Sequence, residues 1–438
     1  MLKDKALKNT IINQLYKIIA GPLTLLFIPI YLLKEEQGYW YTFTSISALS
    51  IFADLGFTVI VLQFAAHEFS FLKFDDNGLI VGDEFHKHKL ADFFRFSVKW
   101  LTRVSAIVFF IIISGGFYFL DTKTEIFISW KMSWFIYSFA SCIVFINSCI
   151  LSFYEGCNGV AVTQIIRFKI SVFSNIVMLI SLFLGFKLYS LAFSAFISAF
   201  VGLFYIIKVY KNSLIQLWKI SKKSTYNWGN EFFNLIWRYA VSWISGYGSM
   251  QIYVPLAFKY YDSVVAGKIG LSIALCMAAF NISNVFLTSK IPDFNMLIEQ
   301  KQWNELNKLF TNAFTKTIFL FVFGLGGFYI VFYIFYNNNN IEILQRLLSP
   351  VPLLMLFIAW LLQNIINGFA VYLRAYKEEP LYKASFLNAV YVIISTLFVI
   401  NKLGYEAIFI GFLTGNIFML PYVYYLYKRK VNLNMENI

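Results

Sequence analysis

Asp54 lies in the middle of a long apolar run, YTFTSISALSIFADLGFTVIVLQFAA (residues 41–66). A carboxylate inside such a run is too costly in lipid unless it faces protein or water. Its chemistry leaves three roles open: a cation or proton site that faces a lumen, a charge partner for a basic residue, or a carboxylate close to the membrane surface. The first role would let the protein bind and release an ion.

Basic residues form a second group that could bind a ligand. Arg95, Lys99 and Arg103 are spaced four residues apart, so on a helix they form one positive stripe. This stripe could receive an anionic head group. Alternatively, the long side chains extend to the lipid surface, as is common at the ends of membrane segments.

Further charged residues lie next to apolar segments: Glu155, Arg167, Arg238 and Arg374. Arginine is suited to phosphate because its planar fork makes two parallel hydrogen bonds. The alternative is a set of salt bridges that hold a closed gate. The candidate substrate-binding residues are Arg103, Arg167, Arg238 and Arg374, and the candidate residues for ion coupling or gating are Asp54 and Glu155.

Apolar segments of membrane-crossing length must position these residues. Of the 438 residues, 59% are hydrophobic and 13% are charged. A helix needs about 20 apolar residues to cross the hydrocarbon core. The sequence contains about twelve such segments, at 10–32, 40–66, 100–120, 130–154, 166–186, 188–210, 236–258, 264–288, 317–336, 347–373, 381–401 and 404–427. We therefore expect an all-α polytopic membrane protein.

The distribution of charge predicts the orientation. An even number of spans places both termini on one side, and the alternate loops on that side hold most of the 36 Lys and Arg residues. The positive-inside rule makes that side cytoplasmic. The net charge of +13 is then mostly an orientation signal with attraction to anionic lipids, and no nucleic-acid partner is expected.

A weak internal echo predicts two lobes of six helices around a central cavity. Pro29 ends one apolar segment and Gly38 opens the next, and Pro255 and Gly267 repeat this arrangement later in the chain. Duplicated halves are typical of alternating-access transporters. We expect an N-terminal lobe, a cytoplasmic connector and a C-terminal lobe, at 1–210, 211–235 and 236–438.

Other chemistries have little support. The four cysteines form no C-x-x-C pair, and His86 and His88 have no further clustered ligands, so no metal site, disulfide or cofactor is expected. The loops on the non-cytoplasmic side are too short for a catalytic domain, so we do not expect an enzyme. The first segment is long and lacks a cleavage site, and is expected to be a true span.

Five stretches carry a resemblance to a known family: GYWYTFTSISALSIFADLGFTVIVLQFAAHE (38–68), SFYEGCNGV (152–160) with Arg167 following, WRYAVSWISGYGSMQIYVP (237–255), SKIPDF (289–294) and YLRAYKEEP (372–380). Together they resemble the O-antigen flippases of the multidrug, oligosaccharidyl-lipid and polysaccharide exporter (MOP) superfamily. Asp54, Glu155, Arg167, Arg238 and Arg374 lie in or beside these stretches.

The resemblance implies a flippase in the bacterial inner membrane. Such a protein moves an undecaprenyl-diphosphate-linked oligosaccharide from the cytoplasmic to the periplasmic leaflet, coupled to a proton or sodium ion. Membrane lipids, a polysaccharide polymerase and chain-length proteins are candidate partners. Three alternatives stay open: a cation-coupled multidrug exporter of the same superfamily, a membrane-embedded glycan polymerase or transferase, and a non-transporting scaffold.

Overall fold

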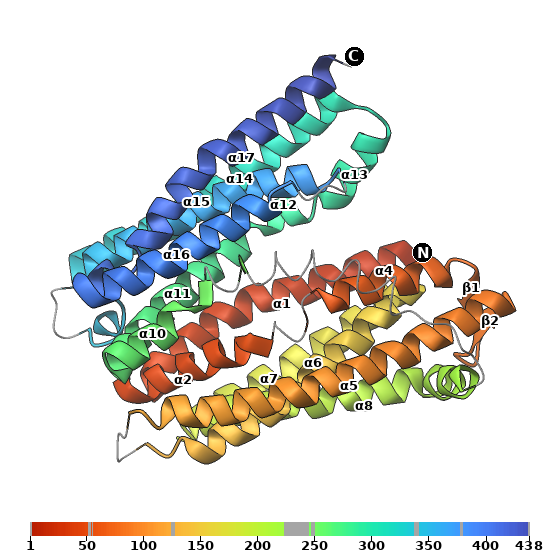
Figure 1. Cartoon of the computed structure of the whole chain (residues 1–438), viewed down its shortest axis with the longest axis horizontal. Coiled ribbons are helices and arrows are strands. Elements are labelled where there is room, and N and C mark those ends of the chain that lie inside the picture. The colour runs from red at the N-terminus through yellow and green to blue at the C-terminus, as the bar shows by residue number, and fades with distance from the viewer. Residues whose placement is uncertain are drawn as a thin grey trace. The chain divides into compact units, whose positions relative to one another are not determined.

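The computed structural model describes residues 2–50, 54, 56–123, 128–222, 245–246, 250–336, 341–376 and 380–436. Helices make up almost all of this part of the chain (Figure 1). Many large apolar side chains on the outer faces of these helices are exposed, among them Phe110 at 71% and Phe323 at 71%. Such extensive apolar surface is unfavourable in water but favourable in contact with lipid tails. The protein is an all-α polytopic membrane protein.

The first half of the chain contains seven α-helices, two short helical segments and one hairpin among its described residues. They are α1 (Leu2–Tyr31), α2 (Lys34–Ser47), the short helix η1 (Ala48–Ser50), α4 (Phe57–Phe69), β1 (Leu72–Phe74), β2 (Ile80–Gly82), α5 (Glu84–Leu120), α6 (Lys131–Tyr154), the π-turn η2 (Glu155–Gly159), α7 (Val160–Phe183) and α8 (Tyr189–Ser221).

The second half is built in the same way, from long helices joined by short ones. They are α10 (Tyr253–Tyr260), α11 (Ser263–Ser283), α12 (Val285–Thr288), α13 (Ile291–Glu299), α14 (Trp303–Phe335), η3 (Leu344–Arg346), α15 (Pro350–Arg374), α16 (Tyr382–Lys402), η4 (Tyr405–Ala407) and α17 (Ile410–Glu436).

Nine helical stretches among the described residues are long and apolar enough to cross a membrane. One of them, Lys131–Phe183, contains two of the segments expected from the sequence, so the nine stretches cover ten of those segments. The expected segment 40–66 is instead divided among α2, η1 and α4. The remaining expected segment, 236–258, lies mostly outside the described residues.

The chain reverses direction between α6 and α7. Asn158 has a positive φ of 59°, which breaks the helix at this point. The side chains of Glu155 and Arg167 meet at 3.0 Å, although twelve residues of continuous helix would separate them by about 18 Å. The turn therefore makes α6 and α7 two separate spans that both pack along α8.

A β-hairpin follows α4 and is fastened to the end of α8. Its strands pair antiparallel, with Leu72 opposite Gly82 and Phe74 opposite Ile80. The side chain of Gln216 accepts a hydrogen bond from the Ile80 amide at 2.8 Å and donates one to the Ile80 carbonyl at 2.9 Å. A two-stranded hairpin has marginal stability by itself. The Gln216 side chain stabilises it by taking the place of a third strand beside Ile80.

The described helices group into two compact units. Unit 1 comprises residues 1–32 and 43–244, and unit 2 comprises residues 33–42 and 245–438. The first residues of α2 thus pack with the second half of the chain. Gln37 donates a hydrogen bond to the Gly267 carbonyl at 2.8 Å, and the ring of Tyr39 meets that of Phe258 edge-on, with 5.0 Å between centroids.

The two units use similar helix contacts. In unit 1, α6 and α7 pack against α8, and in unit 2, α15 and α16 pack against α17. Buried Asn147 joins α6 to α8 by donating to the Ala199 carbonyl at 2.7 Å. Buried Asn416 joins α17 to α15 by donating to the Ala359 carbonyl at 3.0 Å. Such bonds hold helices together where water is excluded.

Candidate functional site

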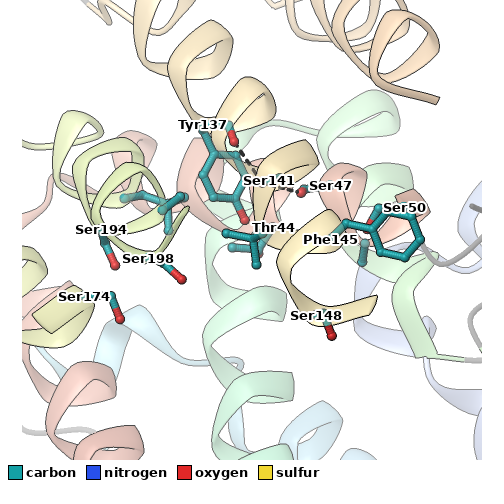
Figure 2. A pocket seen from close by; sticks show the side chains of 14 residues that line it. Thr44, Ser47, Ser50, Tyr137, Ser141, Phe145, Ser148, Ser174, Ser194 and Ser198 are labelled. Carbon is teal, nitrogen blue, oxygen red and sulfur yellow. Dashed lines mark hydrogen bonds between the residues drawn. The ribbon is translucent and has the colours of Figure 1, made fainter. Parts of the chain in front are cut away.

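A cavity of about 510 Å³ lies within unit 1, among α2, η1, α6, α7 and α8 (Figure 2). Nine of its fourteen lining residues carry a hydroxyl group: seven serines, Thr44 and Tyr137. None of the fourteen is charged. This volume is typical of small-molecule pockets, which span about 300–1,000 Å³. The cavity is therefore polar but uncharged.

Helical spacing brings the hydroxyl groups to one place. Tyr137, Ser141 and Ser148 are four and seven residues apart on α6, so they share one face of that helix. Ser194 and Ser198 are four residues apart on α8 and line the cavity from another side (Figure 2).

Some hydroxyl groups of the cavity have hydrogen-bond partners in the protein, among them Ser174, which donates to the Ser171 carbonyl at 3.2 Å, and a second set does not. Ser141 donates to the Tyr137 carbonyl at 2.8 Å, and Ser47 donates to Ser141 at 3.2 Å. Serine in a helix commonly bonds in this way to a carbonyl one turn earlier. The second set makes no hydrogen bond with any described residue and consists of Ser50, Ser148, Ser194 and Ser198. These hydroxyls are available to a ligand or to water.

Glu155 and Arg167, two of the residues expected from the sequence, form a partly buried ion pair. Their side chains are 12% and 26% exposed, and Arg167 donates from Nε to Oε1 at 3.0 Å and from Nη2 to Oε2 at 3.4 Å. The Oε1 atom also accepts from Thr163 at 3.1 Å and from Gln164 at 3.3 Å. Asn13 of α1 bonds Gln164 at 3.0 Å, which ties α1 to this network.

Asp54 caps a helix. Its carboxylate accepts the Thr58 amide at 2.9 Å and the Thr58 hydroxyl at 3.1 Å, in the first turn of α4. A carboxylate is favourable at a helix N-terminus because unpaired amides and the helix dipole meet it there. Asp54 forms no ion pair with any described residue and does not line the cavity.

The arginines expected to bind substrate are in different surroundings. Arg103 is exposed on α5, and Arg374 is exposed at the last residue of α15 in unit 2. Arg95 donates to the Ser221 carbonyl at 2.8 Å, at the end of α8. Arg238 lies outside the described residues. The described members of this set do not converge on the cavity of unit 1.

Comparison with solved structures gives one consistent fold. Over 96% of this chain and 87% of the other, it superimposes on "Lipid II flippase MurJ, inward closed conformation" with a TM-score of 0.64 and 14% identity. An inward-facing multidrug resistance MATE transporter gives 0.59 at 13% identity, over 96% of this chain and 99% of that one. A MOP superfamily transporter from Pyrococcus furiosus gives 0.56 at 10% identity, over 99% and 97% of the two chains.

This chain has the MOP transporter fold. No family model and no curated protein sequence matches it. The structural neighbours are transporters, and at these identities they establish the fold alone.

The hydroxyl-lined cavity of this MOP-fold protein was not predicted from the sequence. Ser141 and Ser148 belong to the stretch SCIVFINSCILS (141–152), where helical spacing of serine was a usable signal. The signal was weak because serine is also common at close helix contacts. Ser50 in η1 and Ser174 in α7 come from distant segments, and only the packing of the helices brings them to one cavity.

A charged cluster stabilises the end of α4 outside its apolar run. The Glu68 side chain is only 2% exposed, and its carboxylate meets Lys89 at 2.8 Å, His86 at 2.8 Å and His67 at 3.4 Å. Burial by itself would raise the pKa of Glu68, but the hydrogen bonds from Lys89, His86 and His67 outweigh it and lower the pKa. The cluster joins α4 to the start of α5.

Glu68→Gln should therefore make the protein less stable in a pH-dependent way. The pKa of Glu68 in the folded protein is below that of an unfolded chain, about 4.3. Its contribution to stability is present above that value and is lost as the pH falls through the folded-state pKa. We expect a lower unfolding temperature for the variant near neutral pH, and a difference that shrinks in acid. Glu84→Gln is the matched control, since Glu84 is 71% exposed. A difference that persists unchanged in acid would contradict the assignment.

Proposed function

We propose that this protein is a flippase for an undecaprenyl-diphosphate-linked oligosaccharide, the repeat unit of O-antigen or a related surface polysaccharide. It moves this lipid from the cytoplasmic to the periplasmic leaflet of the bacterial inner membrane by ion-coupled alternating access. One observation carries the proposal: a MOP-fold chain with an open cavity whose described lining residues are rich in hydroxyl groups and uncharged.

The substrate class explains why such a cavity is needed. A glycan and a diphosphate cannot enter hydrocarbon without large desolvation costs, whereas the prenyl chain is at home there. A transporter for this lipid must therefore shelter the polar head and leave the tail in the membrane. In this proposal both termini are cytoplasmic, and lobes 1–210 and 236–438, joined by the connector 211–235, alternate access.

In this proposal the arginines and the carboxylates have different roles. Arg103, Arg167, Arg238 and Arg374 are the candidates for the diphosphate. Arg167 is held by Glu155 at 3.0 Å, so binding phosphate requires it to exchange one partner for another. Asp54 and Glu155 are the candidates for coupling to a proton or sodium ion.

A multidrug exporter is the second candidate, because a MATE transporter shares the fold. Transport of organic cations would favour a carboxylate within the binding cavity, where it could pair with the positive charge. None of the described residues that line the unit 1 cavity has one. The cavity chemistry therefore favours the flippase.

Deletion of the gene in its host tests the proposal. We expect loss of the surface polysaccharide and accumulation of its lipid-linked repeat unit on the cytoplasmic side, both reversed by the wild-type gene. Susceptibility to cationic drugs should stay unchanged. Normal polysaccharide together with increased drug susceptibility would reverse the ranking of the two candidates.

A further inference from the structure

We propose that the unit 1 cavity is the site that binds the glycan of the substrate, and that it selects neutral sugars. The inference rests on the proposed function and adds to it a division of labour. The cavity binds sugar hydroxyl groups, while the diphosphate is held by residues outside the cavity.

The first support is the excess of hydrogen-bonding capacity in the cavity. The hydroxyls of Ser50, Ser148, Ser194 and Ser198 have no partner among the described residues. Each hydroxyl can donate one hydrogen bond and accept two. A sugar ring has the same capacities around its rim, so it can exchange hydrogen bonds with such a wall in both directions.

A second, independent observation comes from a small extension of the cavity. The extension has a volume of about 20 Å³ and shares Ser50, Ser141 and Phe145 with the main cavity. Ser138 lines it, is 2% exposed, and its hydroxyl has no hydrogen-bond partner in the described part of the chain. A buried hydroxyl without a partner is costly, so a polar group from a ligand or a water molecule is needed there.

The described residues that line the cavity carry no charge, and this favours one part of the substrate over the others. They offer no cation to a phosphate or a uronic acid, and no carboxylate to a drug cation. An unpaired charge away from water costs far more free energy than an unpaired hydroxyl. Neutral sugars avoid this cost and can still use the serines.

The cavity also offers apolar surface for the faces of a sugar ring. Phe145, Val144 and Leu191 line it beside the serines, and Phe145 and Ser50 both line the small extension as well. Pockets that combine an aromatic or aliphatic wall with a few placed polar groups orient a ligand while burying it. The rim of the sugar then meets hydroxyls and its faces meet carbon.

The test compares two probes on the full-length protein in lipid nanodiscs. The first is the lipid-linked oligosaccharide that accumulates in the deletion strain, and the second is undecaprenyl diphosphate without glycan. We expect the wild type to bind the first at least about tenfold more tightly, given the worth of several hydrogen bonds. The triple variant Ser148→Ala, Ser194→Ala and Ser198→Ala should lose this difference and bind undecaprenyl diphosphate as the wild type does.

Two controls separate binding from folding. Ser114→Ala changes an exposed serine of α5 that bonds the Phe110 carbonyl at 2.6 Å, and it should keep the full difference between probes. The single variant Ser198→Ala should retain the fold and lose about threefold of the glycan-dependent affinity, the equivalent of one modest hydrogen bond.

The outcomes distinguish failure of the glycan site from failure of the proposed function. If the triple variant keeps the preference for the glycosylated probe, the glycan is bound elsewhere and this inference is wrong, although the proposed function stands. If the variant loses affinity for both probes equally, the serines are not a glycan site. If the wild type binds neither probe, the proposed function fails, and the inference fails with it.

Discussion

Glu155→Ala should lower the free energy of unfolding by about 1–3 kcal/mol and abolish transport. The change leaves the partly buried Arg167 guanidinium, whose side chain is 26% exposed, without its carboxylate. Thr163 and Gln164 lose a hydrogen-bond acceptor at the same time. The measurement is thermal unfolding of the purified protein in nanodiscs, alongside restoration of surface polysaccharide in the deletion strain.

The chain supplies a matched control for this prediction. Lys131 and Asp121 form an ion pair at 3.4 Å, with side chains 68% and 60% exposed. Breaking an exposed pair costs at most about 1 kcal/mol, so Asp121→Ala should have little effect. The exchange of Glu155→Arg with Arg167→Glu should recover part of the lost stability. Equal effects of Glu155→Ala and Asp121→Ala would show that burial of the pair does not matter.

Gly38→Ala should destabilise unit 2 by about 1–3 kcal/mol or more. A methyl group at this position would overlap the backbone carbonyl of Ser263, and backbone atoms cannot rotate away as a side chain can. The start of α2 would have to move off α11, which would weaken the hydrogen bond from Gln37 to Gly267. We expect a lower unfolding temperature and reduced restoration of surface polysaccharide.

Gly324→Ala is the control for the loss of a glycine. Gly324 lies in α14, and nothing lies within 4 Å of the position that its Cβ would occupy. Alanine is favoured over glycine inside a helix by about 1 kcal/mol, so this variant should be neutral or more stable. If Gly38→Ala behaved like Gly324→Ala, the close approach of α2 to α11 would not be required in the working protein.

These variants examine different parts of the proposed cycle. The Glu155–Arg167 pair belongs to unit 1 and holds the turn between α6 and α7. Gly38 belongs to the short stretch 33–42 that packs with unit 2, although the rest of α2 packs with unit 1. Transport defects without loss of stability at either place would point to a role in the change of access.

Several features of the fold follow from the sequence because they depend on composition and period alone. Apolar runs of about 20 residues have to be helical in a membrane, since no other open structure satisfies its own backbone groups. The stretch that forms α14, for example, is apolar over enough residues to predict a membrane-spanning helix from the sequence alone. The break between α2 and α4 was not visible, because the apolar run continues across it from residue 41 to residue 66.

The sequence also identified Glu155 and Arg167 as candidate functional residues, because charged residues are uncommon next to apolar membrane segments. It could not show that the two form a pair, since that depends on the reversal of the chain at Asn158. The three roles considered for Asp54 did not include capping α4, which depends on where that helix begins.

What the sequence alone determined is therefore the membrane character of the chain, its helical class and a short set of charged residues, because hydrophobicity and charge are properties of single segments. Only the tertiary structure decided where a ligand can be enclosed. The cavity of unit 1 is made by serines from α6, α7 and α8 together with η1, and each of them resembles any other small polar residue in a helix. A cavity needs walls from several segments at once, so it forms only when the helices pack together.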